Sequence, residues 1–524
     1  MINDPTPQLG NQSGTVAVDL PPRLPSDDTA FFGHPRGLST LFFTEMWERF
    51  SYYGIRPLLV LYMTAALVDG GFGFDPKTAG AIVGIYASSV YLASLPGGWI
   101  ADRLLGLRRS IRLGAILIAL GHIAIGLSAM LSRPAFFAGL ALIVMGTGLL
   151  KPNISAIVGD LYPEGGARRD AGFSIFYMGI NTGALIAPII TGLLGEKVGW
   201  HWGFGAAGAG MIVGVIVFSL RQNKTLGNLG LEPSRHPDPV VQERQQRSIK
   251  TGLAMFVGAL VLLVALAVSG VIQIDPVRVA ESMRIVMLGI AVLYFAYLFV
   301  LGGLTGDEKK RVAVILVLFV FATIFWSAFE QAPTSLNLFA RDYTDRVVFG
   351  WEMPATFLQA FNSLFVILLA PVFAWLWITL SRRGGDLSSP AKFGLGLLFA
   401  SLGFFLMVAA SKLVIGGHGI RVSPWWLILS YLLQTFGELS LSPVGLSSMT
   451  KLAPRKFAGQ MMGVWFLAAA LGNLIAGLVG GDVDPNKLEQ MPALFQQTAI
   501  SLLIAAVVIF ALVVPIRRMM AEAK

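Results

Sequence analysis

The sequence has no cysteine and few charged residues. The absence of cysteine from all 524 positions excludes disulfide bonds and thiolate metal sites. Charged residues make up 13% of the chain and hydrophobic residues 55%, whereas a soluble domain carries about 25% charged residues. Mean hydropathy is +0.69, and the apolar runs leave no stretch for an independent water-soluble core. The composition therefore predicts an integral membrane protein.

Motifs of common enzymes are missing as well. The chain has neither a G-x-x-x-x-G-K-[ST] phosphate loop nor an H-E-x-x-H zinc motif, so no metal or other cofactor is implied. The five histidines are scattered, at His34, His122, His201, His236 and His418. His122 stands alone in an apolar run and is interpreted as a packing residue. A membrane enzyme is thus the weaker reading of this chain.

Long apolar runs predict an all-α membrane protein. Each run has about 20 residues or more, enough to cross roughly 30 Å of hydrocarbon, and is too long for the roughly ten-residue strands of an outer-membrane barrel. We expect fourteen membrane helices, near residues 38–67, 78–104, 110–131, 135–160, 170–197, 201–220, 251–271, 281–303, 311–340, 355–380, 391–413, 424–450, 457–480 and 496–516.

The net charge of +9 is concentrated in alternate loops, which argues for a membrane orientation signal and against a nucleic-acid partner. The even-numbered connections hold most of the loop cations: Arg103, Arg108, Arg109, Arg112, Arg168, Arg169, Arg221, Lys224, Arg235, Arg244, Arg247, Lys250, Lys309, Lys310, Arg311, Arg382, Arg383, Lys392, Lys451, Arg455 and Lys456. By the positive-inside rule, we expect both termini in the cytoplasm and the chain in the plasma (inner) membrane.

The polar segments divide the chain into parts. The expected parts are a disordered cytoplasmic tail (1–36), a six-helix bundle (37–220), a cytoplasmic linker (221–250), an extra helix pair (251–303), a second six-helix bundle (304–518) and a short cytoplasmic tail (519–524). Two bundles of six joined by a pair of packing helices favour a secondary transporter with a binding site near the bilayer midplane.

Charged side chains inside the first span form one face. Taking 100° per residue, Glu45, Glu48, Arg49, Arg56 and the neighbouring tyrosines 52 and 53 fall within about 140° of one another. Each charge costs several kcal/mol in a membrane and should have a partner. A simpler reading is that Glu45 and Arg49, at i and i+4, neutralise each other. We expect Glu48 and Arg56 to find partners elsewhere.

Three further charges lie in later spans beside helix breakers. Lys151 precedes Pro152, Glu330 precedes Pro333, and Glu438 lies between Gly437 and Pro443. Helices broken at such points expose backbone groups to a cavity with moving walls. Altogether three intramembrane cations face four carboxylates, so one carboxylate has no cation of its own and readily takes up a proton. This is the physical basis for proton coupling.

Residues 45–54, Glu-Met-Trp-Glu-Arg-Phe-Ser-Tyr-Tyr-Gly, resemble the E-x-x-E-R-F-x-Y-Y-G motif of the proton-dependent oligopeptide transporter (POT) family of the major facilitator superfamily. Segments 98–109, 176–185, 325–331 and 436–443 are similar to four further motifs, and the resemblance covers about residues 37–518. It implies two six-helix bundles plus two extra helices, functional as a monomer. The implied activity is proton-coupled import of di- and tripeptides by alternating access.

The resemblance also implies site residues. Arg49, Tyr53 and Lys151 would receive a peptide's carboxylate. Glu438, Asn181 and Asn362 would receive its ammonium group. The matching aromatic positions for peptide side chains are Tyr52, Tyr91, Trp326 and Trp465. The residues assigned to proton coupling are Glu45, Glu48, Arg49, Arg56 and Glu330.

Two ion pairs between the bundles are implied as gates. Arg56 would pair with Glu330 on the outer side and Lys151 with Glu438 on the inner side, and protonation of Glu330 would release the outer pair. One departure from the family pattern is Ala184, where serine is more usual. The main alternatives are a proton-coupled carrier of nitrate or another small anion, and a channel. The complete E-x-x-E-R motif and Lys151 favour peptides.

Overall fold

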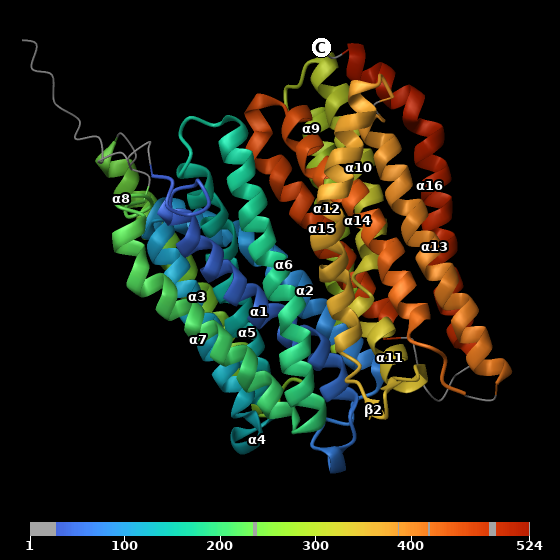
Figure 1. The fold of residues 1–524 in the computed structure, drawn as a ribbon. Coiled ribbons are helices and arrows are strands. Elements are labelled where there is room, and N and C mark those ends of the chain that lie inside the picture. The colour runs from blue at the N-terminus through green and yellow to red at the C-terminus, as the bar shows by residue number, and fades with distance from the viewer. Residues whose placement is uncertain (1–27, 234–237, 386, 418–419, 482–488, 523–524) are drawn as a thin grey trace, which may run out of the picture.

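The computed structural model describes residues 28–233, 238–385, 387–417, 420–481 and 489–522, and these are mainly long helices (Figure 1). The helices are α1 (Arg36–Thr64), α2 (Pro76–Ile100), α3 (Leu107–Gly126), α4 (Ser128–Leu131), α5 (Arg133–Asp160), α6 (Gly166–Lys197), α7 (Trp200–Thr225), α8 (Pro239–Val268), α9 (Pro276–Val300), α10 (Gly306–Phe329), α11 (Asn337–Tyr343), α12 (Phe357–Arg382), α13 (Ser389–Gly416), α14 (Trp425–Leu452), α15 (Ala458–Gly480) and α16 (Met491–Glu522). Short helical turns η1 (Leu67–Asp69), η2 (Ala101–Leu105), η3 (Ala332–Leu336) and η4 (Arg455–Phe457) join some of them. Strands β1 (Val347–Val348) and β2 (Trp351–Glu352) form a small antiparallel hairpin.

Each of the fourteen expected spans coincides with a long helix. Twelve helical segments of the described chain are long and apolar enough to cross a membrane. The other two long helices, α1 with 29 residues and α14 with 28, carry more polar side chains. Their polar side chains make α1 and α14 less apolar than the other twelve. The same polar side chains make both helices candidates for a binding site.

Two expectations about helix bounds and breaks were wrong, and one is confirmed. The linker 221–250 is much shorter, because α7 continues to Thr225 and α8 begins at Pro239, where Gln, Glu and Arg favour a helix. The break expected beside Glu330 is present, because α10 ends at Phe329 and η3 begins at Ala332 with Pro333 in its first turn. The helices α5 and α14 run without interruption through their prolines, so breaks expected beside Lys151 and Glu438 are absent there.

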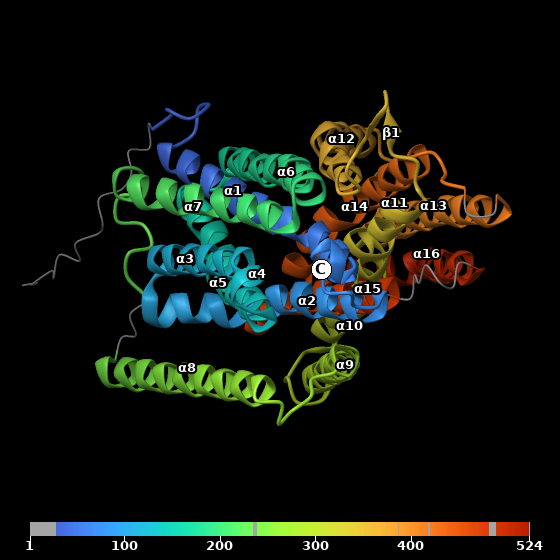
Figure 2. The ribbon, with the colours of Figure 1, turned by 90° about the horizontal axis from the view of Figure 1, so that it is seen from below.

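The helices form two bundles and a peripheral pair (Figure 2). The N-terminal bundle consists of α1, α2, α3, α5, α6 and α7, and the C-terminal bundle of α10 and α12–α16. Helix α9 contacts α2, α10 and α15, whereas α8 contacts the bundles mainly through η2. Only 6% of the apolar window of α8 is buried, as expected for a helix surrounded by lipid.

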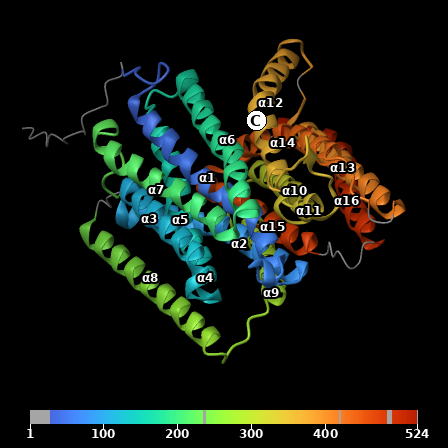
Figure 3. The same cartoon turned by 60° about the horizontal axis from the view of Figure 1, so that its bottom comes forward.

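The bundles meet closely at one end of the molecule. We call the end where α1 stops and the β1–β2 hairpin lies the hairpin end, and the opposite end, where α1 begins and α16 stops, the terminal end (Figure 1; Figure 3 turns the hairpin end toward the viewer). At the hairpin end α2 packs on α15, and a Cβ on Gly80 would lie 2.5 Å from the carbonyl oxygen of Gly477. Glycine at both positions therefore permits backbone contact between the bundles.

Part of the expected N-terminal tail is held against the N-terminal bundle. The guanidinium of Arg168 donates to the carbonyl of Asp28 at 2.9 Å, and His34 Nδ1 lies 2.9 Å from the hydroxyl of Tyr162. Residues 1–27 of that tail lie outside the described residues. At the other terminus, α16 continues to Glu522 through most of the expected tail 519–524.

Candidate functional site

The charged face of α1 is buried near the middle of the bundle. Arg49 Nε lies 3.1 Å from Glu45 Oε1 and also contacts the carboxylate of Glu48, and all three side chains are at most 4% exposed. One guanidinium thus serves both carboxylates, and Lys151 of α5 also attracts Glu48 electrostatically from another helix. Within the described chain, no partner reaches Glu45 Oε2, Glu48 Oε1 or Arg49 Nη2. The cluster thus keeps one donor and two acceptors for other groups.

Close packing of α6 fixes the position of Arg49. A Cβ on Gly183 would lie 2.2 Å from the carbonyl oxygen of Met46 and 3.2 Å from the Cβ of Arg49. Glycine at position 183, within the segment similar to the family's fifth-helix motif, lets α6 approach the α1 backbone. The expected departure, Ala184, is buried next to it.

Tyr52 joins two parts of the α1 face. Its ring lies 5.2 Å from the guanidinium carbon of Arg49 and 5.7 Å from that of Arg56. Tyr53 packs on Tyr52 edge to face, with ring centroids 5.2 Å apart. Tyr86 of α2 stacks on Tyr52 at 6.1 Å and was not predicted. An electron-rich ring between two cations stabilises both through cation–π attraction.

The ion pair expected between Arg56 and Glu330 is present and joins the bundles. Arg56 contacts the Glu330 carboxylate and donates to Asn473 Oδ1 at 3.1 Å. Glu330 lies at the end of α10, where the chain breaks before η3. Asn473 was missed by the sequence analysis, although it is the only amide in the apolar run 463–481. A buried amide in such a run signals a polar partner.

Lys151 lies on the N-terminal bundle's side of the site. Its ammonium nitrogen is 4.2 Å from the ring centroid of Tyr91. The ammonium group is repelled by Arg49 and attracted by Glu48 and Glu45. The helix α5 continues through Pro152, and next to it the side-chain amide of Asn153 donates to the carbonyl of Leu149 at 2.6 Å. Lys151 is half-buried, so its ammonium group remains available to a ligand.

Glu438 lies on the opposite wall, in α14. Asn362 of α12 donates to Glu438 Oε2 at 3.4 Å and to Thr435 Oγ1 at 3.0 Å. The expected ion pair between Lys151 and Glu438 is not formed between these two described residues. Each is held instead by a partner from its own bundle, Tyr91 or Asn362, as expected when the two bundles are apart at that depth.

The remaining predicted residues lie on α6, α10 and α15. Asn181 donates to the carbonyl of Tyr177 in its own helix at 3.0 Å. Trp326 packs edge to face on Phe329 at 5.5 Å, and its indole N–H has no partner among the described residues. Trp465 covers Gly445, where a Cβ would lie 2.3 Å from its ring. These residues place a polar side chain on the N-terminal bundle and two aromatic side chains on the C-terminal bundle.

A family model described as the POT family matches residues 108–488. The chain belongs to the POT family. The predicted fold class, an all-α major facilitator fold of two six-helix bundles plus two extra helices, is confirmed with it. This POT protein is a multi-pass membrane transporter.

The similarity extends over nearly the whole chain. The Peptide transporter YePEPT of Yersinia enterocolitica subsp. palearctica serotype O:3 is 49% identical over 494 residues, covering 94% of this chain and 96% of that protein. A di-/tripeptide transporter of Lactococcus lactis subsp. lactis is 40% identical over 465 residues, covering 86% and 90%.

Solved structures of POT transporters share the fold. A peptide transporter POT in complex with sulfate has a TM-score of 0.85 at 41% identity, covering 93% of this chain and 96% of that one. A POT family transporter in complex with a thioalcohol-conjugated peptide has a TM-score of 0.83 at 35% identity, covering 93% and 98%.

Proposed function

We propose that this POT protein is a proton-coupled symporter that imports di- and tripeptides by alternating access, acting as a monomer. Relatives at 49% and 40% identity are named as transporters of peptides and of di- and tripeptides. These names favour peptides over nitrate or another small anion, and a transporter family makes the enzyme reading unlikely.

The observation that carries the proposal is the opposite charge of the two walls. Arg49, with an unpartnered Nη2, and the half-buried Lys151 belong to the N-terminal bundle, whereas Glu438 belongs to the C-terminal bundle. Every peptide is a zwitterion at neutral pH, so its carboxylate and ammonium groups fit such walls regardless of side chain. In this assignment Tyr53 assists at the carboxylate, and Asn181 and Asn362 assist at the ammonium.

The aromatic side chains supply the tolerant part of the site. Tyr52, Tyr91, Trp326 and Trp465 present rings from both bundles. Rings bind apolar and aromatic side chains with little directional demand, which suits a transporter that accepts many peptides.

Proton coupling is assigned to the carboxylates that share cations. Glu45 and Glu48 share Arg49, and Glu330 holds Arg56 across the two bundles. A proton on Glu330 removes its charge and with it the attraction that keeps the hairpin end closed. A proton on Glu45 or Glu48 leaves Arg49 freer to bind a peptide carboxylate.

We assign the hairpin end to the outside of the plasma (inner) membrane and the terminal end, with both termini, to the cytoplasm. The described residues of the basic even-numbered connections lie at the terminal end. With Arg56 paired and the Lys151–Glu438 pair open, the structure corresponds to an inward-facing state. A division into tail, bundle, linker, helix pair and bundle remains our proposal for its domains, with the linker reduced to the segment between Thr225 and Pro239.

Uptake into liposomes tests this function. We expect labelled dialanine to accumulate in vesicles under an inward-directed proton gradient and to stop accumulating when a protonophore removes the gradient. Excess unlabelled dipeptide should compete, whereas excess nitrate should not. Competition by nitrate with none by dipeptides would establish the anion carrier instead.

A further inference from the structure

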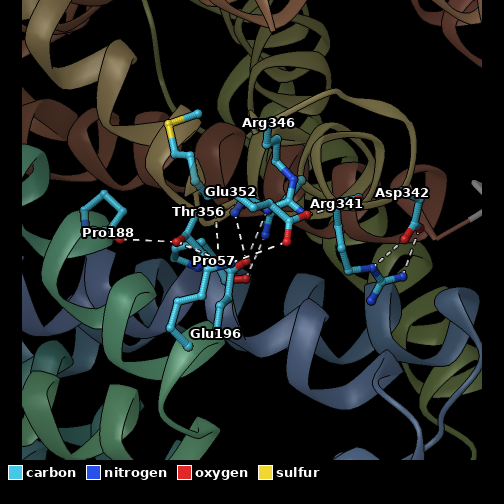
Figure 4. A network of polar contacts seen from close by, with 12 residues as sticks. Pro57, Pro188, Glu196, Arg341, Asp342, Arg346, Glu352 and Thr356 are labelled. Carbon is cyan, nitrogen blue, oxygen red and sulfur yellow. Dashed lines mark hydrogen bonds and ion pairs between the residues drawn. The ribbon is translucent and has the colours of Figure 1, made fainter. Parts of the chain in front are cut away.

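The end of α6 and the beginning of α12 meet at the hairpin end through one carboxylate (Figure 4). Glu196 Oε2 accepts the backbone N–H of Ala355 at 2.8 Å. Its other oxygen accepts the backbone N–H of Thr356 at 3.0 Å and the Thr356 hydroxyl at 2.9 Å. Glu196 belongs to the N-terminal bundle, and both of its partners belong to the C-terminal bundle.

These two N–H groups are the unsatisfied donors at the start of α12. The chain turns into the helix at Pro354, whose carbonyl accepts the N–H of Phe357 at 3.2 Å. No side chain at the N-terminus of α12 caps it. The first N–H groups of any helix lack partners within the helix and favour a negative charge. Glu196 therefore acts as the N-terminal cap of a helix in the other bundle.

The contact requires α6 to approach Thr356 closely. A Cβ on Gly192 would lie 1.7 Å from Thr356 Oγ1 and 2.9 Å from the Thr356 Cβ. Thr356 Oγ1 also lies 3.2 Å from the carbonyl oxygen of Pro188. Glycine at position 192 is thus the only side-chain choice that admits Thr356 in this position.

A second layer of charges surrounds the contact. The guanidinium of Arg346 is 7% exposed, with Nη1 3.9 Å from Glu196 Oε2 and Nη2 3.1 Å from Glu352 Oε1. Lys197 Nζ lies 3.4 Å from the other oxygen of Glu352. Arg346 and Glu352 belong to the C-terminal half, so the contacts of Arg346 with Glu196 and of Glu352 with Lys197 also cross between the bundles.

We infer that Gly192, Glu196 and Thr356 form an α6–α12 latch, a gate contact of the transport cycle that is separate from Arg56–Glu330. Glu196 is its positioning residue. The latch exists only while the hairpin end is closed, because parting of the bundles takes the cap away from α12. Opening to the outside must therefore uncap a helix. This inference rests on the proposed alternating-access function.

Spin-label distances test the latch directly. The chain has no cysteine, so Val68→Cys and Val347→Cys give a unique pair across the hairpin end. Val68 is 93% exposed and belongs to the N-terminal side, and Val347 is 54% exposed and lies on β1. Pulsed electron paramagnetic resonance in lipid nanodiscs then reports the ratio of open to closed molecules.

The variants are graded by what they remove. Glu196→Gln should raise the open-to-closed ratio roughly 2- to 30-fold, the range for loss of a helix cap. Gly192→Ala should shift the ratio in the same direction, because its Cβ cannot coexist with Thr356. Thr356→Ala removes one of the three hydrogen bonds and should give a smaller shift. Glu281→Gln removes an exposed carboxylate from the peripheral helix α9 near the same end and should not change the open-to-closed ratio.

Two results would overturn the latch. The first is an unchanged distance distribution in folded Glu196→Gln and Thr356→Ala proteins. The second is strong non-additivity with Glu330→Gln, beyond about twofold, which would make both contacts one gate. The distance measurement needs no substrate, so a shift in a protein that transports no peptide would support the latch and reject the proposed function. Peptide transport with unshifted distances would support the proposed function and reject the latch.

Discussion

Replacement of Glu438 by glutamine separates the two ends of a bound peptide. The change keeps the size of the side chain and its capacity to accept from Asn362, but removes the negative charge of the C-terminal wall. We expect the mutant to lose affinity for dialanine and to retain its affinity for N-acetyl-dialanine. The acetylated ligand has no ammonium group for Glu438 to bind.

The magnitude follows from the hydrogen bonding of Glu438. Its carboxylate accepts one long bond, at 3.4 Å from Asn362, so most of its acceptor capacity is free for a ligand. Hydrogen bonds to charged groups contribute about 1.5–3 kcal/mol each. The preference for dialanine over its N-acetyl form should therefore fall by about 10-fold to more than 100-fold.

The assay is inhibition of labelled dialanine uptake by dialanine, N-acetyl-dialanine and dialanine amide. Lys151→Gln is the matched variant on the other wall and should blunt discrimination against the amide instead. The ligand then supplies one change and the protein the other, as in a double-mutant cycle. Equal losses for all three ligands in both mutants would refute the clamp and leave these residues with a role only in shaping the cavity.

Three further results are expected. Glu330→Gln, which removes the charge that holds Arg56, should abolish proton-driven accumulation of dialanine while peptide exchange persists; unchanged accumulation would move the coupling site to Glu45 or Glu48. Arg346 lowers the pKa of Glu352 below its usual 4.5, so that pair is fully formed above pH 4.5 and is lost only as pH falls through the lowered value; the effect of Glu352→Gln on the spin-label distances should thus be equal at pH 7 and pH 5, and an effect that vanishes at pH 5 would contradict this. Reporter fusions at Lys524 and within 221–250 should both report the cytoplasm, and a periplasmic signal from either would reject the proposed orientation.

The sequence predicted the membrane helices well and singled out a small set of charged candidates for a site. Apolar length is a one-dimensional property, so all fourteen spans could be placed, and charges within them were few enough to single out α1, Lys151, Glu330 and Glu438. Boundaries failed where helices continue into water, as at the start of α8, because polar residues with high helix propensity carry no membrane signal.

Pairing between helices was harder to predict. That one guanidinium serves both Glu45 and Glu48 depends on rotamers, and the open Lys151–Glu438 pair depends on which state of the cycle is present. Tyr86 and the α6–α12 latch could not be found from the sequence, since an exposed-looking glutamate near a helix end is common. Only the fold brings Glu196 to the start of a helix 160 residues away.

Simultaneous measurement of proton and peptide flux tests the central claim most directly. Liposomes holding the protein and a pH-sensitive dye begin with equal pH inside and outside, and dialanine is then added outside. We expect the interior to acidify only when dialanine is present, and we expect Glu330→Gln to abolish the acidification. Entry of labelled dialanine with no change in internal pH would contradict this expectation.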